Sequence, residues 1–488
     1  MVNATDRVFS RIPGTDHPSM DGKRYLTDPF DVIRMGLAAS NWTEVTANDV
    51  PAMKNRTYAH PPHMFSGGER GGPMATYLVS AMGRSNFHLW INTSVERINR
   101  VGGHAVSLDL VATSDGGRQG TVSLTPTTGR VVLSAGAFGT PKLLFRSGIG
   151  PTDQLQTVQQ SVDGAKMTAK ENWVIHPTVG YNLNDHLNTD TVISHPNVSY
   201  YDWPAAWLTP NATDQSNYLT KRIGPLAQAA PNIGPIFWEE IMGPDGILRH
   251  MQWQGRAEGS NGIPNGQSMT LSLYLGRGQV SRGRATIQKG LNMIVDTIPY
   301  GDPNDMAVVA TAIDNMVKAL KVVPNLTWNL PPLNQTGAEY LKTVPLTYAN
   351  VGARRANHWM GTAKIGSDSA LKNGTAVVDI NCLVSFPERF DDIADDRRCT
   401  ELTTSLSWTL LSSQDRPLPI PALSLSQHLS MLLRGFWHCQ FQIRRKPNRM
   451  RAGVMDASKE LNLNSHLSCV SSILECNLSN ETFRAIRA

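Results

Sequence analysis

Long hydrophobic runs and cysteines are both scarce in this sequence of 488 residues. No stretch approaches the ~20 consecutive apolar residues that a membrane-spanning helix requires, so we expect no membrane-spanning segment. No cysteine occurs before Cys382, the spacing of the five cysteines fits no zinc site, and their odd number leaves at least one thiol unpaired. The sequence predicts no metal site, and the tail is either a disulfide framework or a segment of different origin. The cysteines are Cys382, Cys399, Cys439, Cys469 and Cys476.

Charge is also sparse. Charged residues make up 17% of the chain, and the formal net charge of +5 is small and dispersed. We therefore expect no nucleic-acid partner. The densest basic cluster begins at Arg444–Lys446, where a solvated tail explains it at least as well as a partner does. Hydrophobic residues form 40% of the chain, and the length allows two or three globular domains.

The first six residues contain no apolar core and cannot form a signal peptide. Asn-x-Ser/Thr sequons are nevertheless dense, which predicts a secreted and glycosylated protein. The simplest reconciliation is a chain whose true N-terminus has been lost. The sequons lie at Asn3, Asn41, Asn55, Asn92, Asn197, Asn211, Asn325, Asn334, Asn373, Asn477 and Asn480.

The run from Gly129 to Pro151 has a dense local organisation. A short apolar strand, Val131–Leu133, leads into small residues at 134–137, a helix predicted from Pro141 to Arg146, and a tight turn at Ser147–Gly150. A strand that enters a helix through a small-residue turn can present backbone N–H groups to a dinucleotide. An ordinary strand–turn–helix connection is the alternative.

Four blocks in this run resemble the second signature of the glucose–methanol–choline (GMC) flavin oxidoreductases: Gly136-Ala137, Thr140-Pro141, Leu143-Leu144 and Ser147–Gly150. Three further segments resemble the flavin domain of fungal cellobiose dehydrogenases: Thr15–Tyr25, Arg70–Tyr77 and Asn357–Trp359. The resemblance extends from about residue 8 to about residue 382.

This resemblance implies an α/β plus α+β fold, in which a partial GMC FAD-binding domain is joined to a substrate domain built on an antiparallel sheet. It assigns residues 1–152 to the rear part of the FAD-binding domain, 153–349 to the substrate-binding cap domain and 350–382 to the catalytic segment that returns to the flavin. Residues 383–488 match nothing expected of the family. A shifted reading frame, a retained intron or a novel extension would explain them.

The resemblance also implies roles for individual residues. His358 matches the histidine that faces the flavin, and an imidazole suits the removal of a hydroxyl proton because its pKa lies near the working pH. Asn357 and Arg256 match residues that contact the sugar, although a turn asparagine and an exposed arginine are the simpler alternatives. Ala356 departs from the serine common in cellobiose dehydrogenases, which weakens the expectation of sugar binding.

Four residues are expected at the cofactor. Ser134, Ala135 and Gly136 form the small-residue turn before the helix, and Val95 matches the valine whose backbone meets the adenine of FAD. An ordinary strand valine is the alternative for Val95. The segment Val179–His186 resembles a family motif in which Asn182 and Asp185 organise a loop, so we interpret Asp185 and His186 as structural. Ser281–Arg284 resembles a family strand-entry motif without a catalytic role.

Several parts of a GMC enzyme are missing. The sequence contains no Gly-x-Gly-x-x-Gly motif, with which such enzymes bind the FAD pyrophosphate. We expect the chain to begin about two hundred residues into the flavin domain. The second catalytic side chain of the C-terminal segment is not recognisable, and we expect no haem domain within these 488 residues.

Periodicity predicts the elements around these motifs. Helices are expected at Pro29–Ala39, at residues 73–83 and at Asp305–Val322. Residues 152–249 are expected to be largely irregular. Strands are expected at Phe87–Ile91, Val95–Ile98, Ala105–Val111, Val122–Leu124, Met269–Leu275 and Ala285–Ile287.

Three functions stay open. The first is an FAD-dependent dehydrogenase that oxidises a cello-oligosaccharide to a lactone and passes electrons to an external acceptor. The second is a GMC alcohol or sugar oxidase of another specificity. The third is a non-catalytic fragment that cannot hold FAD, in which case the purified chain would be colourless and would not oxidise cellobiose.

Overall fold

The computed structural model describes residues 2–228, 233–347, 354–369, 374–379, 383–384 and 402–404. All of them belong to one compact unit that comprises residues 1–427. The five cysteines and the basic cluster after residue 443 lie outside the described residues. The predicted domain boundaries after residues 152, 349 and 382 stay predictions.

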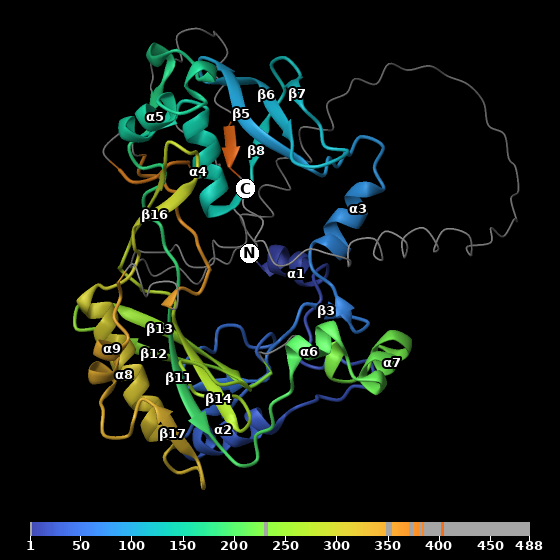
Figure 1. Cartoon of the computed structure of the whole chain (residues 1–488), viewed down its shortest axis with the longest axis vertical. Helices are drawn as coiled ribbons and strands as arrows, with labels where there is room; N and C mark the ends of the chain where they lie inside the picture. The colour runs from blue at the N-terminus through green and yellow to red at the C-terminus, as the bar shows by residue number, and fades with distance from the viewer. Residues whose placement is uncertain are drawn as a thin grey trace, which may run out of the picture. The chain divides into compact units, whose positions relative to one another are not determined.

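The largest sheet has seven strands and is mostly antiparallel; only β1 and β2 run parallel. Its long central strands lie side by side in Figure 1. Although residues 152–249 were expected to be largely irregular, this stretch supplies two full strands and the start of a third. In spatial order the strands are β1 (Thr43–Glu44), β2 (Thr57–Ala59), β12 (Ile236–Met242), β13 (Leu248–Arg256), β14 (Ser268–Leu275), β11 (Leu187–Ser194) and β17 (Thr327–Leu330).

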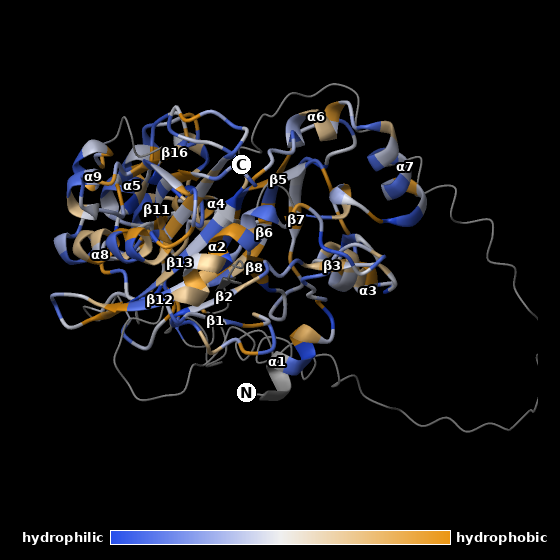
Figure 2. Cartoon of the chain, turned by 90° about the horizontal axis from the view of Figure 1, so that it is seen from below, coloured by the Kyte–Doolittle hydropathy of each residue, from blue (hydrophilic) through white to orange (hydrophobic). Residues whose placement is uncertain are grey.

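Two helices pack on one face of this sheet. Helix α2 (Asp28–Ala39) and helix α8 (Pro303–Leu320) both contribute to the main core cluster, as predicted from their apolar spacing. In α8, Val309, Ile313 and Met316 are fully buried. Both helices mix hydrophobic and hydrophilic residues, which is typical of helices with one buried side (Figure 2).

Strand β14 shows why the two faces of the sheet differ. Its sequence alternates between Met269, Leu271, Leu273 and Leu275, which are fully buried in the core, and a polar set that includes Tyr274. Because successive side chains of a strand point to opposite faces, the second face of the sheet carries hydrogen-bonding groups. The candidate site lies at this polar face, where Tyr274 lies beside His358.

A second core cluster surrounds helix α4 (Gly136–Arg146). An antiparallel sheet of β5 (Thr93–Val101), β6 (His104–Ala112) and β7 (Gly120–Ser123) confirms three predicted strands. Strand β8 (Val131–Leu133), also predicted, pairs in parallel with β18 (Leu402–Thr404).

One sequence prediction is wrong in this region and another is confirmed. Phe87–Ile91 forms no strand: Leu89 and Ile91 are 54% and 66% exposed, and Arg118 covers the ring of Trp90. Apolar residues alone do not make a strand without a pairing partner. Residues 73–83 are helical as predicted, in η1 (Met74–Leu78) and α3 (Val79–Met82). Met74 and Met82 are exposed, Met74 to 78%, whereas Tyr77 and Leu78 are partly buried.

Helix α4 begins at Gly136, five residues before the predicted start, so Pro141 lies inside the helix. A proline in this position cannot donate to the carbonyl four residues earlier, that of Ala137. The Thr362 hydroxyl donates to that carbonyl over 2.6 Å. The helix therefore continues through the proline because a distant segment supplies the missing donor.

Shorter elements complete the described part of the chain. Strand pairs are β3–β4, β9–β10 and β15–β16, and β15 confirms the prediction at Ala285–Ile287. No described helix is long and apolar enough to cross a membrane. The remaining bounds are α1 (Val2–Phe9), β3 (Phe65–Ser66), β4 (Glu69–Arg70), β9 (Ile149–Gly150), α5 (Thr152–Gln159), η2 (Gly164–Lys166), η3 (Lys170–Asn172), β10 (Val174–Ile175), α6 (Trp203–Leu208), α7 (Ala212–Lys221), η4 (Pro225–Ala227), β15 (Arg284–Ile287), β16 (Met293–Thr297) and α9 (Gly337–Thr343).

Candidate functional site

The loop that carries Asn357 and His358 is held by one buried carboxylate. Asp185 is fully buried, and its Oδ1 accepts a hydrogen bond from the backbone N–H of His358 at 2.6 Å. Its Oδ2 accepts from the N–H groups of Ala356 at 3.0 Å and Asn357 at 3.2 Å, and from the Tyr300 hydroxyl at 2.5 Å. Asn357 takes a left-handed φ of 62°, which asparagine tolerates better than most residues.

Three chain segments run side by side behind this loop. Residues 180–184 bond on one side to residues 283–285 and on the other to residues 360–362. Asn184 and Met360 exchange both backbone hydrogen bonds at 2.9 Å. Across the same segments, the Asn182 side chain accepts from Arg282 and donates to the Gly361 carbonyl. The predicted loop-organising role of Asn182 and Asp185 agrees with these contacts.

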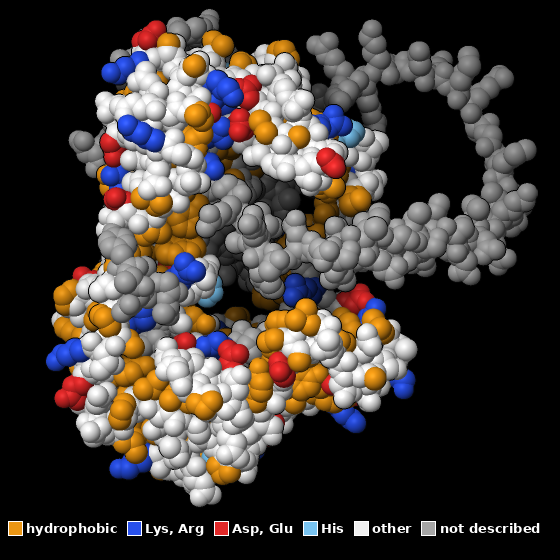
Figure 3. Space-filling model, viewed as in Figure 1, with side chains coloured by type: hydrophobic (Ala, Val, Ile, Leu, Met, Phe, Trp, Pro, Cys, Tyr) orange, Lys and Arg blue, Asp and Glu red, His pale blue; other side chains and the backbone are white. Residues whose placement is uncertain are grey.

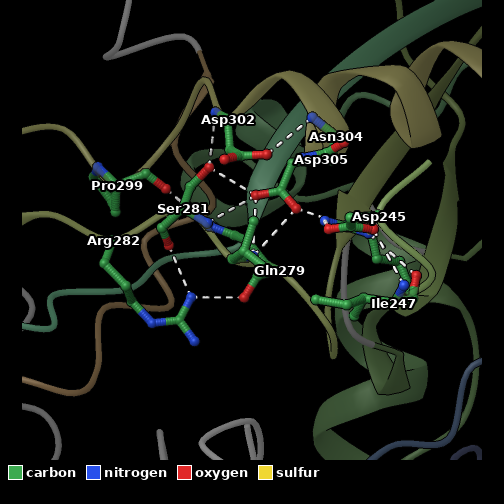
Figure 4. Close-up of polar contacts among 11 residues, drawn as sticks. Asp245, Ile247, Gln279, Ser281, Arg282, Pro299, Asp302, Asn304 and Asp305 are labelled. Atoms are coloured by element: carbon green, nitrogen blue, oxygen red, sulfur yellow. Dashed lines mark hydrogen bonds and ion pairs between the residues drawn. The ribbon is translucent and has the colours of Figure 1, made fainter. Parts of the chain in front are cut away.

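A buried ion pair anchors the segment of Ser281 and Arg282, which leads into residues 283–285. Asp305, in the first turn of α8, accepts from Arg249 Nε at 2.7 Å, and both side chains are at most 1% exposed. Asp305 Oδ2 also accepts from the backbone N–H and the hydroxyl of Ser281 at 2.9 and 2.7 Å (Figure 4). Asp302 caps α8 beside it, with Oδ1 accepting from Asn304 N–H. The segment that contains Ser281 and Arg282 is thus fixed to α8.

His358 is exposed at the end of this scaffold. Its ring lies 5.1 Å from that of His186 and 5.6 Å from that of Tyr274, measured between centroids. The two histidines approach through their Nδ1 atoms, which are 3.0 Å apart. Burial, and to a lesser degree the nearby His358, lower the pKa of His186 to about 4, so His186 is neutral at neutral pH.

Arg256 lies further along the polar face of the sheet. It bonds to Asp190 Oδ2 at 3.1 Å and to Glu258, while Ser272 donates to Asp190 Oδ1 at 2.7 Å. Ser272 and Tyr274 are on the same face of β14, so this ion-pair cluster and His358 share one surface. The carboxylates of Asp190 and Glu258 compensate the charge of Arg256. In Figure 3 acidic and basic side chains are likewise interspersed over the visible face.

The predicted cofactor residues lie at the start of α4. Ser134 and Ala135 are exposed, Gly136 has a φ of 75°, and no atom lies within 4 Å of the place where a Cβ on Gly136 would stand. Among the described residues no side chain caps this helix, and the first N–H groups of a helix can bind an anion. Val95 is 36% exposed in β5. These residues fit the rear of an FAD site, whereas the glycine-rich pyrophosphate motif does not occur in the 488 residues.

Sequence reasoning missed the contact of His358 with His186 and the ring of Tyr274 beside it. The alternation around Ser272 and Tyr274 was visible in the sequence and could have indicated the polar face. The sequence marked His186 only as structural, and nothing in it indicated the contact with His358, because 172 residues separate the two histidines. Within the described ranges, no group of three or more His, Cys, Asp or Glu side chains could hold a metal ion.

Comparison with known proteins finds similar sequences over part of the chain. Residues 21–188 match the family model of GMC oxidoreductases. Pyranose dehydrogenase 2 of Leucoagaricus meleagris is 26% identical over 348 residues, which cover 62% of this chain and 51% of that protein. An oxygen-dependent choline dehydrogenase of Rhizobium johnstonii is 29% identical over 197 residues, 40% of this chain and 32% of that protein. The chain therefore spans about half or less of the length of these relatives.

A solved structure has a similar fold. The FAD-dependent oxidoreductase from Chaetomium thermophilum, determined with a bound fragment, superposes with a TM-score of 0.54 at 17% identity over 72% of this chain and 65% of that one. The expected mixed α/β fold is thereby confirmed. Over residues 21–188, this chain is similar to GMC oxidoreductases, and the two relatives named above are dehydrogenases.

Proposed function

We propose that this chain serves an FAD-dependent oxidation of a CH–OH group, with a cello-oligosaccharide oxidised to its lactone as the specific reaction. The observation that carries the proposal is the Asp185 contact set. It orders three consecutive N–H groups and leaves the imidazole of His358 exposed at the end of the loop. A base for a hydroxyl proton needs this combination of a fixed backbone and an accessible side chain.

The chain's own residues would carry the proton chemistry and the orientation. FAD, when bound, supplies the acceptor for the hydride that leaves the substrate carbon. His358 Nε2 takes the hydroxyl proton, so the C–O single bond becomes a carbonyl as the C–H bond breaks. Asn357 lies next to this base and orients the reacting ring through its amide. The exposed N–H groups at Ser134, Ala135 and Gly136 would hold part of the cofactor.

A sugar substrate is supported by the polar face of the sheet. Arg256 pairs with Thr270, four residues from Tyr274 along β14, which is about 13 Å at ~3.3 Å per residue. A second sugar ring bound beside the first would extend in this direction. The similarity to a pyranose dehydrogenase also favours a sugar. Ala356 has no side-chain hydroxyl with which to bond such a substrate.

The proposal is tested with the full chain, FAD and a dye as the external electron acceptor. Bound FAD is measured by ultrafiltration and by the change in flavin fluorescence, and dye reduction is followed with cellobiose, a pyranose monosaccharide, choline and an aryl alcohol. We expect cellobiose to be the best donor, and H358Q to lose about 10²-fold or more in turnover with FAD binding unchanged. H250Q, a histidine of the same sheet that faces Glu240, is the control. Turnover of choline but not of sugars would contradict the specificity.

A non-catalytic role is the second candidate. The observation in its favour is that no Gly-x-Gly-x-x-Gly motif occurs in the sequence. In that case the purified chain is colourless and binds no FAD at micromolar concentrations. A yellow preparation that releases FAD on denaturation would refute it.

We also propose that the protein is exported and N-glycosylated. In the part of the chain whose side chains are described, seven sequon asparagines are exposed, as a glycan requires. Expression through a secretory route should give a mass that falls on endoglycosidase treatment, and an unchanged mass would contradict this proposal. The exposed asparagines are Asn41, Asn55, Asn92, Asn197, Asn211, Asn325 and Asn334.

A further inference from the structure

We propose that His186 is a positioning residue that keeps His358 in the tautomer with its proton on Nδ1, which leaves Nε2 free as the base. The inference rests on the proposed role of His358. It gives a function to a histidine that the sequence marked only as structural. It also means that His358 depends on a partner 172 residues earlier in the chain.

The geometry requires one proton between the two rings. Their Nδ1 atoms are 3.0 Å apart, a hydrogen-bond distance at which one nitrogen must donate and the other accept. The rings are inclined at 75°, and the centroid distance of 5.1 Å allows no stacking at van der Waals contact. His186 is largely buried and disfavours a charge, so the shared proton joins two neutral imidazoles at rest.

The direction of this hydrogen bond decides whether His358 can act. If His186 donates, the proton of His358 sits on Nε2, and that atom cannot take a proton from a substrate. If His358 donates, Nε2 carries a lone pair, and after proton uptake the imidazolium keeps its Nδ1–H bond to His186. Only the second arrangement persists through proton transfer without a tautomer change. It is the arrangement of a base oriented by an acceptor behind it.

The surrounding groups favour charge on His358 rather than on His186. Asp185 Oδ1 accepts from the backbone of His358, so a carboxylate lies beside the loop. Burial raises the pKa of Tyr274, which therefore faces His358 as a neutral phenol. The Tyr300 hydroxyl donates to Oδ2 of the Asp185 carboxylate at 2.5 Å. With Nδ1 as the acceptor, the single proton of His186 is on Nε2, which is buried without a hydrogen-bond partner within the described structure. A second proton would place a charge on this buried ring, so His186 stays neutral.

The test reads the tautomer directly in the full chain labelled with ¹⁵N-histidine. The pattern of two-bond nitrogen–proton couplings distinguishes an Nδ1–H ring from an Nε2–H ring, and H358Q identifies the His358 signals among the 13 histidines. We expect the Nδ1–H tautomer for His358 in the wild type. In H186L the Nε2–H tautomer, which free imidazole side chains prefer, should predominate because Nδ1 loses its acceptor.

Two further variants separate this role from a structural one. H186Q offers an amide oxygen as acceptor and should restore the Nδ1–H tautomer, whereas H250L, in the large sheet, should leave the tautomer of His358 unchanged. An Nε2–H tautomer of His358 in the wild type, or the same tautomer in wild type and H186L, would overturn the inference. The readout needs neither FAD nor turnover. An inactive chain with the Nδ1–H tautomer would therefore refute the proposed function and leave the role of His186 intact.

Discussion

Replacing Asp185 by asparagine should weaken the loop that carries His358 in a way that the structure specifies. The carboxylate accepts one N–H through Oδ1 and two N–H groups and a hydroxyl through Oδ2. An asparagine of the same shape has one acceptor oxygen and one amino group. The amide should turn so that its oxygen keeps the three donors of the Oδ2 side, and its amino group then opposes the N–H of His358.

The magnitude follows from the bond that is lost. A hydrogen bond to a charged acceptor contributes about 1.5–3 kcal/mol, and an N–H left unpaired costs a similar amount. We therefore expect D185N to lower the free energy of unfolding by about 2–3 kcal/mol. D185A removes all four acceptor contacts and should cost about 4 kcal/mol or more. Y300F removes only the hydroxyl donor, and should cost about 1 kcal/mol.

Urea denaturation followed by tryptophan fluorescence measures these differences, and hydrogen exchange of a peptide covering residues 354–362 measures the local effect. Exchange in this peptide should accelerate in D185N and remain near the wild-type rate in Y300F. If D185N were as stable as the wild type to within about 0.5 kcal/mol, the carboxylate would not hold the loop as argued.

Three other changes test the scaffold. D305A leaves a fully buried arginine with one carboxylate partner and should cost about 3 kcal/mol in a urea titration, against about 1 kcal/mol for the helix cap variant D302A; equal costs would contradict the assignment. T362V should cost about 1–2 kcal/mol in the same titration because the carbonyl opposite Pro141 loses its donor, while T362S should be near wild type. Burial raises the pKa of Glu239 to about 7, so stability present below about pH 4.3 is lost as the pH rises through 7. E239Q should abolish most of a decrease of about 3 kcal/mol between pH 4 and pH 8, and E240Q, at a partly exposed carboxyl, should not.

The sequence predicted those elements whose signal is local. The apolar spacing of α8 and the alternation of β14 both describe one buried face, and both elements are present where the pattern placed them. Phe87–Ile91 failed because an apolar run does not reveal whether a strand lies beside it. The start of α4 was misplaced because a proline is expected at the first turn, whereas a hydroxyl from residue 362 makes Pro141 acceptable inside the helix.

The candidate site was predicted in its parts more than in its connections. His358, Asn357 and Asp185 came from sequence segments that resemble a family, and the structure joins them because Asp185 accepts hydrogen bonds from the backbone N–H groups of Asn357 and His358. The neighbours of His358 could not be predicted in the same way. Its contact with His186 depends on how two distant segments pack, and no local pattern encodes a side-chain distance across 172 residues.

The hydrogen bond from Thr362 to the carbonyl of Ala137 joins residues 225 positions apart. During synthesis, the residues of α4 leave the ribosome long before Thr362. The carbonyl of Ala137 can therefore accept its hydrogen bond only after Thr362 has been made. The hydrogen bonds from the N–H groups of residues 356–358 to Asp185 likewise form only after these residues have been made. The residues around His358 therefore complete the hydrogen bonds of two segments that are made earlier, α4 and the segment of Asp185. The order of translation makes the assembly of this site one of the last events in the folding of the described chain.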